Sequence, residues 1–327
     1  MEHITERYDE DIYESGLFDF YFKGMRVGAL DIETTGLDPA GSKFILGGLF
    51  DFDSRTMHQV FAESRDEEGY ALNEFVREVS TLDMVVTYNG RHFDIPFMNK
   101  RLQRFSMDAV NVFNLDLYLI LNGYSPVKKF VPNLKQKTVE NYMGLWQTRS
   151  DEISGAESVE LYNSYEKTGR HDLKEKILLH NSDDVLQLTR LLKIISKSEF
   201  HKAMFFLGFP AGPLTVKKIK LNRDFMLING SQRTINTDYI SFSIGSYPAE
   251  INMNSNTCEF SMKLPLIRDS GLALVDLDAA GLTRSEFEAY PSCASGFLVL
   301  EEHGRINYME INHFIKSFTE LLINRLR

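Results

Sequence analysis

Four acidic residues are placed in the sequence so that they could meet at one site. Asp31 and Glu33 stand two residues apart directly after residues 27–30, a short apolar run that predicts a buried strand. Successive side chains of a strand alternate between its two faces, so these two carboxylates share one face. Asp94 opens a predicted helix behind a later strand, and Asp184 lies within a longer predicted helix. This order of strands and helices allows all four to converge.

Carboxylates that converge on one site favour the binding of divalent metal ions. They repel one another unless cations neutralise them, and ligand sets made only of oxygen suit Mg²⁺ or Mn²⁺. Two such ions, about 3.5–4 Å apart, can hold the attacking and the leaving oxygen of a phosphoryl displacement. The pattern therefore predicts phosphodiester hydrolysis that depends on divalent metal ions.

Each acid also has an ordinary structural explanation. A carboxylate such as Asp94 is favoured at a helix N-terminus, and Asp184 can be a solvated helix position. An Asp-x-Glu pair also arises by chance in a chain with 46 acidic residues. Burying Asp31 and Glu33 at the end of an apolar strand without a counterion would, however, cost several kcal/mol. The combination therefore favours a joint, metal-binding role.

The elements that must position these residues follow from the apolar periodicity. Three consecutive strands with short loops predict an antiparallel meander, and the later strands, which alternate with helices, predict parallel additions. Together they predict an α/β domain with a mixed five-stranded sheet and flanking helices. The expected strands are 27–30, 43–51, 55–62, 84–87 and 110–117, and the expected helices are 66–80, 93–105, 134–142, 158–166 and 173–196.

The pattern of predicted secondary structure changes near residue 200. Residues 206–213 are expected to form a linker, and the rest is rich in strand patterns before a last amphipathic helix at 312–326. We therefore predict an N-terminal arm (1–24), an α/β domain (25–199) and a β-rich accessory domain (200–327) to which no role is assigned. The strands expected in the last domain are 214–221, 237–244, 257–264, 272–276 and 296–300.

Three segments of the chain resemble a known enzyme family. Residues 30–38 (LDIETTGLD), 86–97 (VTYNGRHFDIPF) and 180–185 (HNSDDV) are similar, in sequence, order and separation, to the three motifs of the DEDD 3′–5′ exonucleases. The YprB-like branch of the ribonuclease H-like proteins is the most similar. Two further stretches resemble that branch, 134–140 (LKQKTVE) and 151–157 (DEISGAE), followed by Tyr162 and Tyr165. The resemblance covers about residues 25–196.

The resemblance implies a ribonuclease H-like fold and a set of functional residues. Asp31, Glu33, Asp94 and Asp184 would be the ligands of two Mg²⁺ or Mn²⁺ ions. His180 stands four residues before Asp184, at the place where one subclass of the family has a tyrosine base. Positions i and i+4 share a helix face, and a histidine with its ordinary pKa of about 6.5 suits proton removal from water. A supporting, non-catalytic role for His180 stays open.

Substrate contacts are also implied by the resemblance. Asn89, Thr34 and Thr35 would touch the nucleic-acid strand or its terminal nucleotide, although Asn89 suits a turn and the two threonines suit a strand end on local chemistry alone. Lys135 belongs to one of three basic groups, some with aromatic residues nearby, that could hold a single strand by phosphate contact and stacking. These groups are Lys128–Lys129, Lys135–Lys137 and Lys217–Lys218–Lys220, with Tyr124, Phe130 and Tyr142 near the first two.

Composition excludes several other classes of protein. The net charge of −10 argues against coating nucleic acid by bulk charge, but not against a local groove with metal ions. Two cysteines, Cys258 and Cys293, cannot build a metal cluster or a disulfide framework, and reduced thiols in the cytoplasm are expected. The sequence has no signal-peptide pattern and no apolar run long enough for a membrane span. Because it also lacks Gly-x-Gly-x-x-Gly and Gly-Lys-Ser/Thr motifs, a nucleotide-binding oxidoreductase is excluded.

The sequence as a whole predicts a cytoplasmic, metal-dependent 3′–5′ exonuclease that acts on DNA or RNA, with a single-stranded 3′ end as its partner. Two alternatives remain: a metal-dependent endonuclease, and a ribonuclease H-like scaffold that binds nucleic acid without cutting it. Retention of all four acids disfavours the scaffold, because a site without metal has no use for buried like charges. Protein partners are not predicted.

Overall fold

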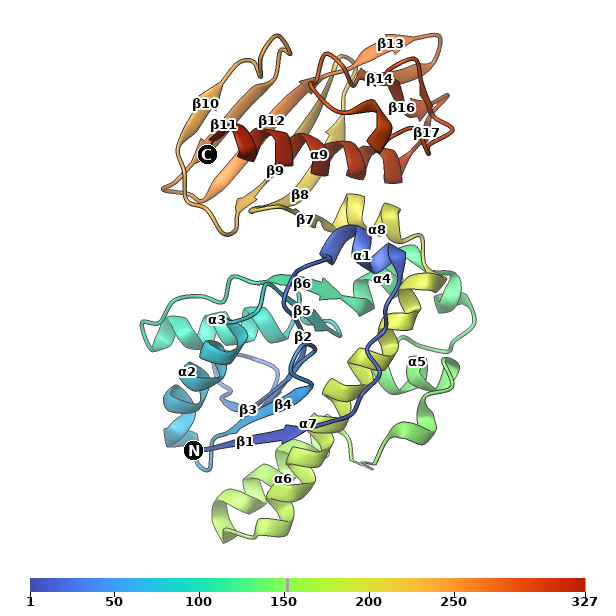
Figure 1. Cartoon of the computed structure of the whole chain (residues 1–327). Coiled ribbons are helices and arrows are strands. Elements are labelled where there is room, and N and C mark those ends of the chain that lie inside the picture. The colour runs from blue at the N-terminus through green and yellow to red at the C-terminus, as the bar shows by residue number, and fades with distance from the viewer. Residues whose placement is uncertain (151–152, 327) are drawn as a thin grey trace. The chain divides into compact units, whose positions relative to one another are not determined.

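The chain divides into two compact units, Met1–Ser198 (unit 1) and Glu199–Arg327 (unit 2), in a computed structural model that describes residues 1–150 and 153–326. Figure 1 shows the course of the chain through both units. Among the described helices, none is both long enough and apolar enough to cross a membrane.

Unit 1 is an α/β domain built on one sheet. Its strands are β1 (Glu2–Arg7), β2 (Val27–Thr34), β3 (Phe44–Asp51), β4 (Thr56–Phe61), β5 (Met84–Thr87) and β6 (Phe113–Asp116). Its α-helices are α1 (Gly16–Phe22), α2 (Glu68–Val79), α3 (Asp94–Arg104), α4 (Leu117–Tyr124), α5 (Gln136–Tyr142), α6 (Gly155–Thr168) and α7 (His171–Leu191).

The sheet is mixed, as predicted. Its order is β1-β4-β3-β2-β5-β6, in which β2, β3 and β4 form the antiparallel meander and β5 and β6 add in parallel. The prediction of five strands is one too few, because β1 pairs with the outer edge of β4. The segment 1–24 is therefore not only an arm. Its strand has no apolar alternation, and most of its residues are exposed.

Because side chains alternate along β2, its apolar residues face the hydrophobic core and its two acidic residues face the opposite side of the sheet. Leu30 and Ile32 point into an apolar cluster that is completed by α2 and α3. Asp31 and Glu33 point to the opposite face, where α7 crosses the sheet and Asn181 contacts Asp31. Figure 1 shows α2 and α3 on one side of this sheet and α7 on the other.

A buried ion pair ties α2 to α3. Arg101 of α3 donates from Nε and Nη2 to the two carboxylate oxygens of Glu68, at 2.6 Å each, and both side chains are almost fully buried. Glu68 also accepts from the backbone N–H of Phe44, and Arg101 donates to the carbonyl of Pro39. The pair therefore fixes the loop between β2 and β3, whose first residues line the candidate site.

Unit 2 is rich in antiparallel strands. One sheet has the order β10-β11-β12-β9-β8-β7, and a second is built from β13 to β17. The strands are β7 (Phe209–Ala211), β8 (Leu214–Leu221), β9 (Phe225–Gln232), β10 (Tyr239–Ser241), β11 (Glu250–Asn254), β12 (Glu259–Pro265), β13 (Ile267–Asp269), β14 (Leu272–Asp276), β15 (Cys293–Ala294), β16 (Phe297–Glu302) and β17 (Arg305–Ile306), and the α-helices are α8 (Phe200–Leu207) and α9 (Tyr308–Leu326).

The linker expected at 206–213 is wrong. This segment contains the end of α8, Gly208 with a φ of 89°, and the short strand β7. Pro210 suggested a break in secondary structure, but a proline is tolerated in an edge strand, and β7 is the outermost strand of its sheet. The predicted β-rich character of the unit is confirmed.

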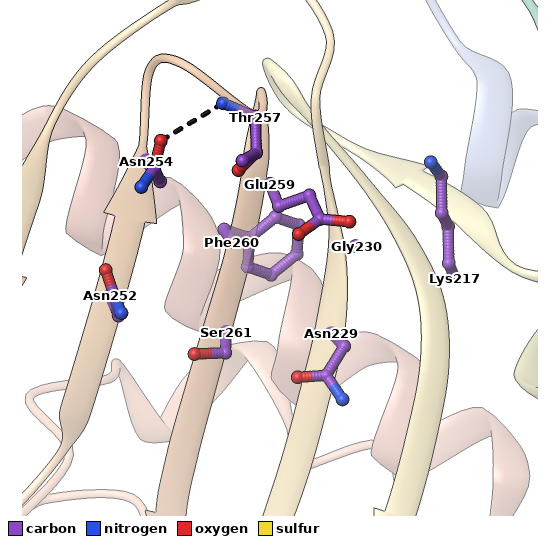
Figure 2. Close-up of a pocket in the computed structure, with 9 residues that line it drawn as sticks. All are labelled: Lys217, Asn229, Gly230, Asn252, Asn254, Thr257, Glu259, Phe260 and Ser261. Carbon is purple, nitrogen blue, oxygen red and sulfur yellow. Dashed lines mark hydrogen bonds between the residues drawn. The ribbon is translucent and has the colours of Figure 1, made fainter.

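The larger sheet of unit 2 exposes a polar face. Asn252, Ser261 and Asn229 lie opposite one another on β11, β12 and β9, and Figure 2 shows their side chains in one row across the three strands. A pocket of about 460 Å³ lies over this row and is lined by Lys217, Asn229, Gly230, Asn252, Asn254, Thr257, Glu259, Phe260 and Ser261. Alternate residues of the same strands, such as Met262, are buried on the other face.

A glycine in β3 lets α7 approach the sheet. Gly48 pairs with Asp31 on the neighbouring strand. A Cβ atom at Gly48 would lie 2.1 Å from Oδ1 of Asn181 and 3.0 Å from Cγ2 of Val185, both on α7. The absence of a side chain at this point therefore sets how near α7 can bring its polar residues to Asp31.

We predict that Gly48→Ala destabilises unit 1 by about 1–3 kcal/mol, because the new methyl group forces α7 away from β3. Urea unfolding measures the effect. Gly123→Ala is the matched control, since nothing lies within 4 Å of a Cβ at this exposed position in α4, and the change there should be neutral or slightly stabilising. Equal effects of the two substitutions would contradict the close approach.

Candidate active site

The two carboxylates of β2 face α7. Glu33 is only 7% exposed, and Asp31 is half-buried. Nδ2 of Asn181 donates to both the backbone carbonyl and Oδ2 of Asp31, at 3.2 Å each. This amide orients the Asp31 carboxylate while leaving its other oxygen for a further partner.

Asp94 reaches the same strand from the start of α3. β5 pairs with β2 only along Val27, Gly28 and Ala29, and then the chain turns into α3. Beyond this paired stretch, the backbone N–H of Ile32 in β2 donates a hydrogen bond to Oδ1 of Asp94 at 3.2 Å. The almost fully buried Asp94 therefore lies beside the segment of β2 that carries Asp31 and Glu33.

The helix α7 supplies the remaining polar groups. His180 and Asp184 are one helical turn apart, and Nε2 of His180 lies 3.6 Å from Oδ2 of Asp184. The same nitrogen lies 3.6 Å from Oε1 of Glu33 on β2. Single ligand atoms of these three residues all lie within 4.8 Å of one another.

The electrostatics of Asp31 reflect this crowding. Burial raises the pKa of Asp31 well above its ordinary value. The negative charges of Asp94, Asp184 and Glu33 raise it further, and the hydrogen bond from Asn181 opposes the shift. The acids therefore act on one another as a group.

Glu33 and Asp94 behave in the same way. Burial raises the pKa of Glu33 to about 7, although His180 opposes the shift and Asp184 adds to it. Burial also raises the pKa of Asp94 to about 7, against the hydrogen bond from Ile32 and other backbone contacts. Both acids would be partly protonated near neutral pH, and a cation placed among them would favour their ionised forms.

The donor set fits a divalent cation. Carboxylate oxygens are the preferred ligands of Mg²⁺ and Mn²⁺, and a neutral imidazole can bind Mn²⁺ or other transition metals. Burial and neighbouring carboxylates raise the pKa values of Asp31, Glu33 and Asp94, and a bound cation would offset both effects. These carboxylates could therefore bind metal.

Arg149 contacts the site. The guanidinium of Arg149 forms a bidentate pair with Glu140, at 2.5 and 2.8 Å, and also donates to Oδ1 of Asp184. Asp183 next to it accepts from the backbone N–H of Ser150. The segment that follows α5 is therefore fastened to α7 through both aspartates.

The site opens into a cavity of about 810 Å³. Asp31, Glu33, His180 and Asp184 line it, whereas Asp94 lies behind them in the wall. The other lining residues are Ile32, Thr34, Thr35, Gly36, Leu37, Phe93, Lys135, Gln136, Lys137, Ser154, Gly155, Ala156, Val159 and Glu160. The cavity is thus bounded by β2, by the loop after it, by the starts of α5 and α6, and by α7.

The predicted substrate contacts fall into two groups. Thr34, Thr35 and Lys135 line the cavity, although the Thr34 hydroxyl donates to the carbonyl of Gly36 and the Thr35 hydroxyl accepts from the backbone N–H of Lys43. Their roles in binding stay predictions.

Asn89 lies elsewhere, in the turn between β5 and α3. Its φ is 65°, its backbone N–H donates to Oδ1 of Asp116, and it is not among the residues that line the cavity. The structure therefore accounts for Asn89 as a turn residue, and its contact with a substrate stays a prediction.

Sequence reasoning missed Asn181, Arg149 and Gln136, which donate to Asp31, to Asp184 and to the backbone carbonyl of Asp184, respectively. Asn181 could have been found, because it lies next to His180 on the helix that carries Asp184. No pattern points to Arg149. Two residues of the resembling stretch 151–157, Asp151 and Glu152, lie outside the described residues.

Comparison with known protein families agrees with this geometry. The family model described as the RNase_H superfamily matches residues 29–196, which are 168 of the 327 residues. The chain belongs to the RNase H superfamily. This confirms the ribonuclease H-like fold predicted for the first domain, and the matched span contains every candidate site residue from Asp31 to Asp184.

Similarity to individual proteins is more distant. No curated protein matches this RNase H superfamily member in sequence. Among solved structures, it is similar to the family B DNA polymerase from the hyperthermophilic archaeon Pyrobaculum calidifontis, with 15% identity and a TM-score of 0.43. The match covers 90% of this chain and 46% of the polymerase chain, so the chain spans about half the length of that polymerase.

The raised pKa values predict an unusual pH dependence of stability. A carboxyl group whose pKa is higher in the folded state binds protons more tightly there, so stability falls as pH rises from the unfolded pKa to the folded one. For Asp94 this window runs from 3.8 to about 7. With chelator present, Asp94→Asn should therefore be more stable than the wild type at pH 8, by about 1–4 kcal/mol, and gain little at pH 4.

Urea unfolding at the two pH values, with EDTA, measures this difference, and Asp172→Asn on the exposed part of α7 is the control. A constant difference between wild type and Asp94→Asn at all pH values would contradict the assigned electrostatics.

Proposed function

We propose that the chain is a metal-dependent 3′–5′ exonuclease that hydrolyses the phosphodiester bonds of DNA or RNA with two Mg²⁺ or Mn²⁺ ions. The proposal rests on one observation: β2 and α7 bring Asp31, Glu33 and Asp184 together at one cavity, and α3 brings the buried Asp94 close enough for its charge to act on Asp31. Membership of the RNase H superfamily supports a nuclease that binds nucleic acid.

The four acids would contribute to cation binding in two ways. Asp31, Glu33 and Asp184 reach the cavity directly, and Asp94 contributes its charge from the wall behind Asp31. Bound divalent ions would acidify a water molecule and stabilise the charge that develops on the leaving oxygen. The chain's own part is to fix these oxygens before substrate arrives, through Asn181 and the backbone N–H of Ile32.

His180 would act as the base. Its Nε2 atom lies between Glu33 and Asp184, on the face of α7 that lines the cavity. In hydrolysis, water would add to phosphorus as its proton passes to Nε2, the bond from phosphorus to the 3′-oxygen would break, and the leaving 3′-oxygen would take up a proton from solvent. The two carboxylates would stabilise the imidazolium that results. A nucleoside monophosphate leaves from the 3′ end.

The substrate would enter along the loop after β2. Thr34 and Thr35 stand at the end of the strand that carries the acids, and Lys135 lies across the cavity at the start of α5. A lysine there can contact a phosphate group, and Phe93 in the wall offers a surface for stacking. A single-stranded 3′ end suits this arrangement best.

End-labelled single-stranded DNA and RNA, incubated with the full chain and Mn²⁺ or Mg²⁺, test the proposal. A 3′ label should be released at once as mononucleotide, a 5′ label should give a ladder that shortens with time, and EDTA should stop both. Cleavage of circular single strands would instead identify an endonuclease. Binding without any cleavage would identify a scaffold.

Substitution of the acids should abolish cleavage. We expect Asp31→Asn and Asp184→Asn to lose at least about 10²-fold in rate, since each removes a charge worth several kcal/mol in the transition state. Asp172→Asn, on the exposed start of the same helix, should stay within about twofold of the wild type. A rate near that of the wild type in either of the first two variants would remove that residue from the mechanism.

His180 can be tested by pH dependence. If it is the base, the wild-type rate at saturating Mn²⁺ should fall as the pH is lowered, and His180→Phe should be at least about 10²-fold slower with a weaker dependence on pH. The rate of single-turnover cleavage from pH 5 to 9 is the measurement. A His180→Phe profile with the same shape as that of the wild type would assign His180 a supporting role.

A further inference from the structure

A second cluster of metal-ligating side chains lies on the opposite face of the sheet of unit 1. His3 of β1 pairs with Val60, and His58 of β4 pairs with Thr5, so the two histidines are diagonal neighbours on one face. Val60 belongs to the apolar cluster under α2, which identifies that face. The imidazole rings are 5.7 Å apart between centroids.

The helix α2 adds carboxylates to this cluster. Glu74 and Glu78 are one turn apart and share a helix face. Nδ1 of His3 lies 3.7 Å from Oε1 of Glu74, and Nδ1 of His58 lies 3.8 Å from Oε2 of Glu78. Single ligand atoms of His3, His58 and Glu78 all lie within 4.8 Å of one another.

An orphaned atom points to a missing partner. Nδ1 of His58 is buried and makes no hydrogen bond with any described residue. A buried polar atom without a partner costs about 1–3 kcal/mol. The 3.8 Å separation from Glu78 is too long for a hydrogen bond but leaves a position between the two atoms.

We propose that His3, His58 and Glu78 bind a divalent transition-metal ion of the Zn²⁺ type, with Glu74 able to supply a fourth ligand. Two imidazoles with carboxylates are a typical zinc donor set, with bonds of about 2.0–2.2 Å in a tetrahedron. Such a tetrahedron separates ligand atoms by about 3.4 Å. The pairs at 3.7 and 3.8 Å need to close by a few tenths of an ångström, and the widest separation within the group, which is at most 4.8 Å, by up to about 1.4 Å.

The bound ion would fasten an otherwise weakly held strand. β1 lies at the edge of the sheet and leaves most of its residues exposed, so it has little apolar contact. A metal ion shared by β1, β4 and α2 links this strand to the core. The site is independent of the proposed function, because its residues lie on the face away from Asp31 and Asp184.

Zinc binding by the metal-depleted full chain tests the proposal. Competition with a chromophoric chelator should show one Zn²⁺ ion whose affinity falls at least tenfold in His58→Ala, His3→Ala and Glu78→Gln. The control His171→Ala removes an exposed histidine that pairs with Glu175 on α7, and it should retain the ion. Asp184→Asn should also retain it.

Two outcomes would overturn the proposal: unchanged Zn²⁺ stoichiometry and affinity in both His58→Ala and Glu78→Gln, or loss of the ion in Asp184→Asn alone. Thermal unfolding is the second measurement and also checks folding. Zn²⁺ should raise the melting temperature of the wild type and of His171→Ala by more than that of the near-isosteric Glu78→Gln, which keeps only the carboxylate site of β2 and α7. An equal rise in all three proteins would likewise contradict the site.

Discussion

The burial of several acids in one pocket is the constraint on which the rest of unit 1 depends. Desolvation raises the pKa values of Asp31, Glu33 and Asp94, and the charge of Asp94 adds to the shift at both other acids. A fold gains nothing in stability from such an arrangement. It becomes favourable only when protons or cations compensate the charge, which links the packing of this domain to metal chemistry.

The surrounding strands and helices hold the acidic side chains close together despite their mutual repulsion. β2 extends past the end of β5, so that a backbone N–H remains to bind Asp94. Gly48 gives α7 the room to place Asn181 against Asp31. Arg149 brings a positive charge to Asp184 from the segment after α5. Each contact fixes one carboxylate before any ligand is bound.

The proximity of the four acids and His180 could be predicted from the sequence because strand alternation and helical spacing place side chains on definite faces, and the motif segments share that spacing, whereas their catalytic roles stay proposals. Strand β1 escaped prediction, because it is charged and is held by pairing with β4, far away in sequence. Pro210 suggested a linker where an edge strand tolerates a proline. Arg149 could not be predicted, since its role depends on a three-dimensional contact that no local pattern encodes.

The most direct test of the account is a crystal structure of the full chain with Mn²⁺ and a short single-stranded oligonucleotide, measured with anomalous scattering from manganese. The account predicts two anomalous peaks in the cavity, within bonding distance of oxygens from Asp31, Glu33 and Asp184. Absence of manganese among these carboxylates, with the oligonucleotide bound elsewhere, would contradict it.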